Sequence, residues 1–232
     1  MFANIAAQTA AYYAAAAVLI PLGYGHLALR RWVRPLTLAG LYAWLVLGVP
    51  LLLFGAFATF SVKAMPDAVA WGLVVLMGLS YTLLPWLAIR FYGGRNVRRT
   101  LATRSPDVTT LEQVHVSLLV VAILFAFGIA TLHLLILLNG LYPAFGTLWT
   151  GQQGVQAIGA TAVAMAILAW GLVRRRAWAW WGAALLSAAL ALSTALTLVP
   201  MSWAQALDAL AFPAYERALL EGIPLHGAYL AM

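Results

Sequence analysis

The sequence predicts an all-α fold: a bundle of six transmembrane helices followed by short amphipathic surface helices at the C-terminus. Of the 232 residues, 65% are hydrophobic and 8% are charged, and the mean hydropathy is +0.94. A soluble domain is typically about 45–50% apolar and about 25% charged, so lipid must be the solvent for most of this surface. Six apolar stretches are also long enough to cross a bilayer.

Arginine placement predicts how these stretches are threaded. Eleven of the twelve arginines fall in three clusters between apolar stretches: Arg30, Arg31 and Arg34; Arg90, Arg95, Arg98, Arg99 and Arg104; and Arg174, Arg175 and Arg176. Short basic loops stay on the cytoplasmic side of a bilayer. We therefore expect a multi-pass protein of the cell (inner) membrane with both termini extracytoplasmic.

The six predicted spans each hold about 20 or more predominantly apolar residues, as a membrane helix requires. They cover residues 5–29, 36–61, 68–90, 111–138, 154–173 and 177–199. Together they form one predicted transmembrane domain, residues 1–200, followed by an extracytoplasmic tail, residues 201–232. Pro21, Pro50 and Pro85 lie inside the first three spans, where the lost backbone hydrogen bond predicts kinks.

The connection between the fourth and fifth spans carries amides instead of charges: Asn139, Gln152, Gln153 and Gln156. We interpret it as a solvated loop. An outer vestibule, with Gln156 facing inward, is the alternative.

Small residues recur at every fourth position of the sixth span, at Ala183, Ser187, Ala191 and Ala195. This spacing lets helix backbones approach closely in lipid. It predicts a contact face within the chain, with a protein partner or in a homo-oligomer.

The tail beyond Pro200 has an amphipathic pattern. Ser202 and Gln205 have the spacing of a capping box, and an apolar face follows at Trp203, Leu207, Leu210 and Ala211. A second short helix is predicted from near Pro213 to Gly222. Both are expected to lie on the outer membrane surface.

Several function classes lack their residues in this sequence. Cysteine is absent, which excludes disulfides, thiolate metal sites and iron–sulfur ligation. The positive charge lies in loops between spans, so we expect lipid and not nucleic acid as the partner. No nucleotide-binding, zinc-hydrolase or serine-hydrolase motif is found. No carboxylate falls at mid-membrane depth, which argues against proton-coupled transport.

The four histidines are the candidate cofactor-binding residues. His115 and His133 lie 18 residues apart on the predicted fourth span, which returns to the same helix face about 27 Å along the axis. His26 is predicted at the depth of His115, and His226 on the side of His133. Imidazole at such positions could ligate haem iron or a chlorophyll-type magnesium. For His133, an interhelical hydrogen bond is the alternative.

A second candidate site is the basic loop after the third span. Arg95, Arg98 and Arg99 follow Tyr92, Gly93 and Gly94, and could bind a phosphate or a lipid head group; a cytoplasmic anchor is the alternative. Glu112 precedes His115 by one turn, which resembles half of a di-metal carboxylate motif, but a second Glu-x-x-His is absent. Thr109 with Glu112 fits a capping box instead.

These observations predict a non-enzymatic multi-pass membrane protein, either an accessory subunit of a membrane complex or a small uncoupled carrier. A tetrapyrrole-holding electron-transfer subunit is one alternative. A lipid-modifying enzyme that uses Glu112, His115 and the basic loop is another. No catalytic or metal-binding residue is predicted.

Overall fold

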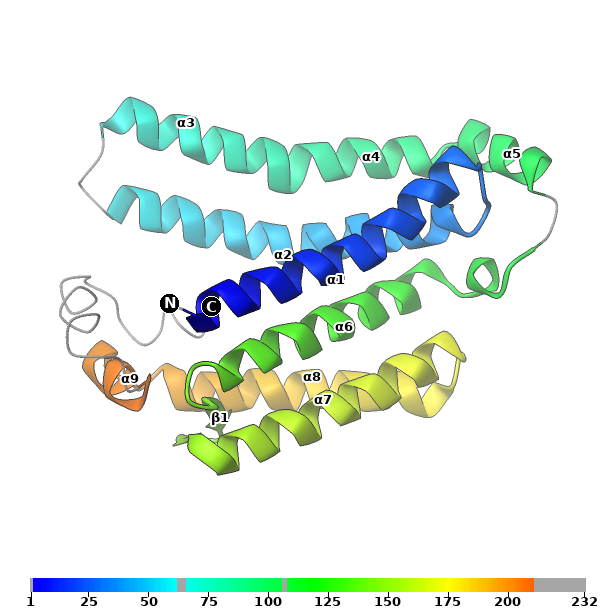
Figure 1. Cartoon of the computed structure of the whole chain (residues 1–232). Helices are drawn as coiled ribbons and strands as arrows, with labels where there is room; N and C mark the ends of the chain where they lie inside the picture. The colour runs from blue at the N-terminus through cyan, green and yellow to red at the C-terminus, as the bar shows by residue number, and fades with distance from the viewer. Residues whose placement is uncertain (1, 62–65, 106–107, 211–232) are drawn as a thin grey trace. The chain divides into compact units, whose positions relative to one another are not determined.

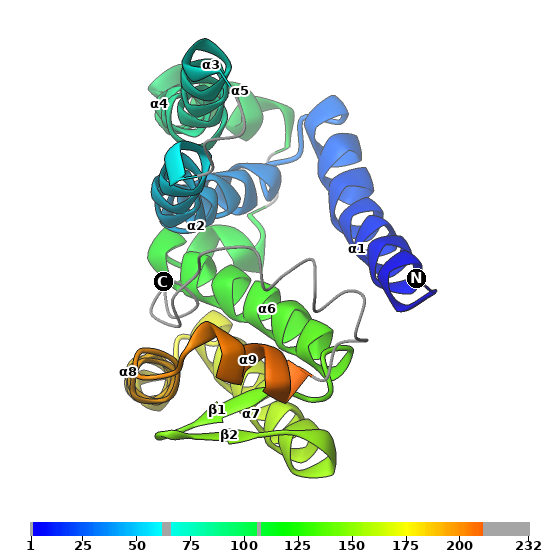
Figure 2. The same ribbon diagram turned by 90° about the vertical axis from the view of Figure 1, so that its left-hand side faces the viewer.

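The computed structural model describes residues 2–61, 66–105 and 108–210, and these residues form helices with one short β-hairpin. They fall into two compact units, Met1–Leu124 and Phe125–Met232. The division lies inside helix α6 (Val116–Ile136). Each unit is described below by itself (Figures 1 and 2).

Unit 1 is built on two long antiparallel segments, α2 and the continuous α3–α4, which lie side by side in Figure 1. Its elements in chain order are α1 (Phe2–Leu27), α2 (Val33–Ser61), α3 (Asp67–Gly78), the π-helix η1 (Leu79–Leu83), α4 (Leu84–Gly93), α5 (Arg95–Arg104), the 3₁₀ helix η2 (Thr110–Gln113) and the start of α6.

Unit 2 continues α6 and adds a β-hairpin and three helices. The hairpin consists of β1 (Tyr142–Ala144) and β2 (Thr147–Trp149), and the helices are α7 (Gly151–Val173), α8 (Ala177–Leu198) and α9 (Trp203–Leu210). The strands pair antiparallel, with Tyr142 opposite Trp149. Helices α7 and α8 pack closely at Gly171, where a side chain would collide with Ala179 and Trp178.

Five helices among the described residues are long and apolar enough to cross a membrane: Val33–Phe60, Asp67–Gly93, Val116–Ile136, Gly151–Val173 and Ala177–Leu198. This indicates a multi-pass membrane protein and confirms helices at five of the six predicted spans. At the first predicted span, the described apolar helix is the shorter Ala16–Leu27, so the six-span count stays a prediction. Large apolar side chains are exposed along these helices, as lipid contact requires.

The third span contains a π turn where the sequence predicts a proline kink. Pro85 has no N–H to donate to the carbonyl of Tyr81, and the Leu84 N–H bonds the Leu79 carbonyl five residues back. The Tyr81 carbonyl oxygen lies 3.0 Å from the position of a Cβ at Gly48. Gly48 therefore allows α2 to approach the π turn, and Trp44 stacks on Tyr81 at 5.8 Å.

The fourth span begins later than predicted. Residues 110–113 form the separate helix η2, Val114 is extended, and α6 starts at Val116 and ends at Ile136. The physical reason is the burial of Val114, which is 5% exposed and packs with Ala39 and Leu119. Packing this side chain against α2 breaks the helix before His115, so His115 precedes α6 and does not lie on it.

The connection between α6 and α7 contains an ordered hairpin, and the amides that suggested a solvated loop (Asn139, Gln152, Gln153 and Gln156) are all exposed. Phe145 and Gly146 form its two-residue turn, with φ of 45° and 95°. Their N–H groups donate to Ser193 Oγ and Thr197 Oγ1, both at 3.0 Å, and Ser193 donates to the Pro143 carbonyl at 2.7 Å. Backbone polar groups shielded from water need such partners.

Replacing Ser193 by alanine is expected to lower the free energy of unfolding by about 1–3 kcal/mol, because two backbone groups lose their partner at a side chain that is 3% exposed. Chemical denaturation of the purified protein measures this loss. Ser187→Ala, at an exposed position of the same helix, is the matched control. Equal effects of the two substitutions would contradict the anchoring role of Ser193.

The remaining predictions for unit 2 are met in part. Ala183 is buried, whereas Ser187, Ala191 and Ala195 are exposed, so the predicted partner face stays a prediction. Gln156 is exposed, which disagrees with the inward orientation that the vestibule alternative requires.

The predicted capping pair opens α9. Ser202 N–H donates to Gln205 at 2.9 Å, and Gln205 N–H donates back to Ser202 Oγ at 3.3 Å. Leu207, on the predicted apolar face, is buried. The second predicted tail helix, residues 213–222, lies outside the described residues.

Candidate anion-binding site

Two of the three arginine clusters meet at one end of unit 1 because α1 and α2 are joined by a tight turn. Leu29 adopts a positive φ of 49°, and Arg30 N–H donates to the Gly25 carbonyl at 2.8 Å. A Cβ at Gly25 would overlap Val33, so only glycine fits the end of α1 against the start of α2. The turn carries Arg31, and Arg34 lies in the first turn of α2.

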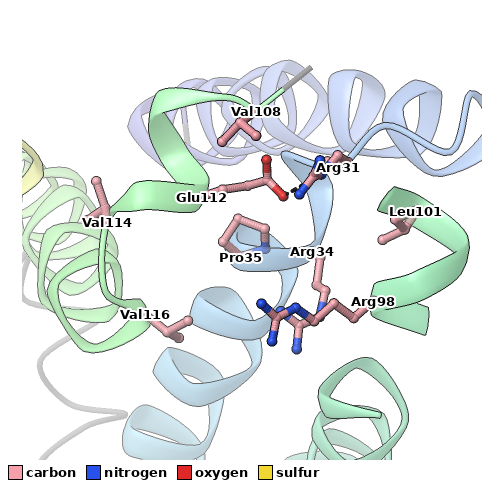
Figure 3. Close-up of a pocket in the computed structure, with 9 residues that line it drawn as sticks. All are labelled: Arg31, Arg34, Pro35, Arg98, Leu101, Val108, Glu112, Val114 and Val116. Carbon is pink, nitrogen blue, oxygen red and sulfur yellow. Dashed lines mark hydrogen bonds and ion pairs between the residues drawn. The ribbon is translucent and has the colours of Figure 1, made fainter. Parts of the chain in front are cut away.

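The junction of α4 and α5 lies at the same end. Gly94 is extended, with φ −62° and ψ 148°, and separates the two helices. Arg34 Nε donates to the Tyr92 carbonyl at 2.9 Å, which ties the start of α2 to the end of α4. Helix α5 then carries Arg98 toward Arg34 (Figure 3).

Glu112 on η2 supplies the acid of the site. Its Oε1 accepts from Arg31 Nε at 3.0 Å, and its Oε2 accepts from the Thr109 N–H at 3.2 Å. Thr109 and Glu112 thus form the predicted capping box, now at the start of η2. Both carboxylate oxygens are engaged, so Glu112 holds Arg31 and η2 in place.

These elements enclose a cavity of about 230 Å³. Its lining consists of Arg31, Arg34, Pro35, Arg98, Leu101, Val108, Glu112, Val114 and Val116. Figure 3 shows the guanidinium groups of Arg34 and Arg98 side by side. Cofactor and drug-sized pockets are usually about 300–1,000 Å³, so this cavity suits a smaller group.

The electrostatics of the cavity favour an anion. Arg34 and Arg98 carry like charges, and Glu112 is the sole acid among the described lining residues. Each arginine also lies in the first turn of its helix, where the helix dipole places partial positive charge. Neither α2 nor α5 contains an acidic residue that would offset this charge. Guanidinium groups bind phosphate and carboxylate through two parallel hydrogen bonds. A bound phosphate would relieve the repulsion between the two arginines.

Glu112→Ala is expected to destabilise unit 1 by about 1–2 kcal/mol, because both the ion pair to Arg31 and the cap of η2 are lost. Thermal unfolding in detergent measures the effect, with Gln113→Ala on the same short helix as the control. Equal midpoints for the two variants would contradict the tethering role of Glu112.

The three residues predicted to bind a lipid head group lie at different places in the structure. All three are exposed: Arg98 lines the cavity, Arg99 lies outside its lining, and Arg95 lines a separate surface described below. Arg31 and Arg34, which line the same cavity as Arg98, were not predicted from the sequence. One sequence signal could have identified Arg34. It lies with Pro35 in the first turn of α2, and this turn contains no acidic residue.

The three described histidines make local hydrogen bonds. His26 Nδ1 donates to the Leu22 carbonyl at 2.7 Å, and the Thr37 hydroxyl lies 3.4 Å from Nε2. His115 Nδ1 contacts Ser117 Oγ at 2.8 Å. His133 Nδ1 donates to the Ile129 carbonyl at 2.7 Å, a bond within its own helix and not the predicted interhelical one.

His115 immediately precedes α6, where its carbonyl accepts the first hydrogen bonds of the helix, and His133 lies on α6. No group of three or more potential metal ligands is found within the described residues, and His226 lies outside them. Tetrapyrrole binding stays an alternative hypothesis.

The chain matches no protein-family model, and no curated protein or solved structure is significantly similar to it. Five helices among the described residues are long and apolar enough to cross a membrane, which indicates the class of multi-pass membrane proteins. A more specific function has to be inferred from the geometry of unit 1.

Proposed function

We propose that this multi-pass membrane protein binds a phosphate-bearing anion in the cavity between Arg34 and Arg98, without catalysing a reaction on it. The observation that carries the proposal is the pair of guanidinium groups, side by side in a cavity of about 230 Å³. Of the two protein classes that the sequence predicts, an accessory subunit would use the site to bind a lipid or partner phosphate, and an uncoupled carrier would bind its cargo there.

The engagement of Glu112 supports binding in preference to catalysis. A general base needs a free carboxylate oxygen within hydrogen-bond reach of its substrate. Here both oxygens accept hydrogen bonds, from Arg31 and from Thr109. His115, the proposed partner of Glu112 in the enzyme hypothesis, turns its Nδ1 to Ser117 instead.

Calorimetric titration of the detergent-purified full chain tests the proposal. The ligands are inorganic phosphate, glycerol 3-phosphate, dioctanoyl phosphatidylglycerol and, as the neutral control, dioctanoyl phosphatidylcholine. We expect saturable binding of the phosphate-bearing anions that is weakened about tenfold in Arg98→Gln. Arg98-dependent binding of the chain-free phosphates identifies a soluble source, and Arg98-dependent binding of phosphatidylglycerol alone identifies a lipid head group. Absence of Arg98-dependent binding for all three anions would overturn the proposal.

Two further measurements separate a subunit from a carrier. A co-purifying protein at fixed stoichiometry supports the accessory subunit. Release of a trapped phosphate ester from sealed vesicles containing the protein, slowed by Arg98→Gln, supports the carrier. A visible absorption spectrum with a Soret band would favour the tetrapyrrole hypothesis instead.

A further inference from the structure

A second concave surface of unit 1 lies between α2 and α4, away from the Arg34–Arg98 cavity. We call the part beside the C-terminal end of α4 its upper part. This part has a volume of about 610 Å³ and is lined by residues that include Tyr42, Trp86, Arg90 and Arg95. Its lower part, about 410 Å³, is lined by Val49, Gly78, Thr82 and Leu83. Leu45 and Trp86 line both parts, so they form one continuous groove, the α2–α4 groove.

The two ends of the groove differ in chemistry. Arg90 and Arg95 are exposed at the upper end, and the guanidinium carbon of Arg90 lies 4.9 Å from the ring centre of Trp86. Tryptophan and arginine together are typical of the membrane interface, where lipid phosphates lie. The lower part is lined by apolar surface, with Val49 42% and Leu83 41% exposed. This is the polarity gradient of a phospholipid.

The length of the groove matches one lipid chain. Gly78 precedes Arg90 by twelve residues, which is about 18 Å of helix at about 1.5 Å per residue. One leaflet of a bilayer has a hydrocarbon depth of about 15 Å, half of the roughly 30 Å core.

The lower end lies at the π turn, a feature that is frequent at functional sites. The Thr82 hydroxyl there is buried and has no hydrogen-bond partner in the structure.

We propose that the α2–α4 groove holds one ordered anionic phospholipid of the surrounding bilayer. Its phosphate lies between Arg90 and Arg95, and one acyl chain follows Leu45 and Trp86 toward Gly78. The charge of the two arginines selects an anionic head group over a zwitterionic one. This site goes beyond the proposed function, because its arginines are different from those of the Arg34–Arg98 cavity.

Glycines in α3 provide a matched test of the groove. A Cβ built on Gly78 or on Gly72 meets no atom within 4 Å, so either position accepts a larger side chain without a clash. Gly78 lines the groove and Gly72 does not line either of its parts. Gly78→Leu therefore fills the lower groove, and Gly72→Leu makes the same change on the same helix outside it.

The experiment uses the full chain in bilayers that contain phosphatidylglycerol or phosphatidylcholine with a photoactivatable group on the acyl chain. Peptide mass spectrometry locates the labelled residues. We expect phosphatidylglycerol to label the segments around Leu45, Val49 and Leu83 several-fold more than phosphatidylcholine does. Gly78→Leu should abolish this labelling and Gly72→Leu should retain it. Arg90→Gln and Arg95→Gln should each reduce the preference for phosphatidylglycerol over phosphatidylcholine about five-fold.

Three results would overturn the inference. The first is equal labelling of all lipid-facing surfaces, and the second is groove labelling without preference for the anionic lipid. The third is an unlabelled groove in a chain that native mass spectrometry shows to be a lipid-free dimer, which would assign the groove to a second copy. Arg98→Gln should leave the labelling unchanged, so failure of the proposed function and of this inference can be told apart.

Discussion

Replacing Gly154 by alanine is expected to lower the free energy of unfolding of unit 2 by about 3 kcal/mol or more. A Cβ at this position would overlap the carbonyl oxygen of Gly140 and would lie 3.0 Å from the carbonyl oxygen of Trp149. Both obstacles are backbone atoms, so no side-chain rotation relieves the collision. The base of the hairpin, where Gly151 N–H donates to the Asn139 carbonyl at 2.7 Å, would have to open.

Chemical denaturation of the purified variant measures this loss, and limited proteolysis between residues 139 and 151 reports whether the hairpin opens. Gly159→Ala is the control on the same helix, because a Cβ there meets no atom within 4 Å. That substitution should be neutral or stabilise the helix by up to about 1 kcal/mol. If Gly154→Ala is as stable as Gly159→Ala, the close approach of Gly154 and Gly140 is wrong.

The double substitution Arg34→Gln with Arg98→Gln is expected to weaken binding of inorganic phosphate about 100-fold, and each single substitution about 10-fold. A hydrogen bond to a charged group contributes about 1.5–3 kcal/mol, and about 1.4 kcal/mol corresponds to a tenfold change in affinity. Titration calorimetry at constant ionic strength measures the affinities.

The matched control removes the same charge from the same region. Arg99→Gln with Arg104→Gln also deletes two arginines, both exposed on α5 and outside the cavity lining. We expect less than a twofold change at physiological ionic strength, because salt screens exposed charges. An equal loss in both double variants would show that the positive surface, and not the cavity, attracts the anion.

The class of the protein could be predicted from sequence because it depends on composition alone. Lipid selects about 20 apolar residues for each crossing, and five such helices are present in the described residues. Local features that depend on residues close together along the chain were also predictable. The Thr109–Glu112 and Ser202–Gln205 capping pairs both form, because each depends on residues three positions apart.

Features that depend on distant packing were not predictable in this way. The break before α6 follows from burial of Val114 beside Ala39, which lies far away along the chain. The hairpin turn uses Phe145 and Gly146, without the asparagine-glycine signal typical of such turns. It is held by Ser193 and Thr197, about fifty residues further on.

The candidate site was predicted in part for the same reason. Arg98 belongs to a visible basic run, which identifies it as a possible ligand for phosphate. The ion pair between Arg31 and Glu112 joins residues 81 positions apart, and the placement of Arg34 depends on the tight turn after Gly25. No spacing rule along the chain brings these residues together.

Arginine modification with phenylglyoxal is the most direct test of the central claim that Arg34 and Arg98 bind a phosphate group. The reagent attacks accessible guanidinium groups. Mass spectrometry reports the extent of modification at each arginine of the full chain without substitutions. We expect phosphate to protect Arg34 and Arg98 several-fold while Arg99 and Arg104 react as fast as before. Equal protection at all four arginines, or protection at none, would show that Arg34 and Arg98 do not form a phosphate site.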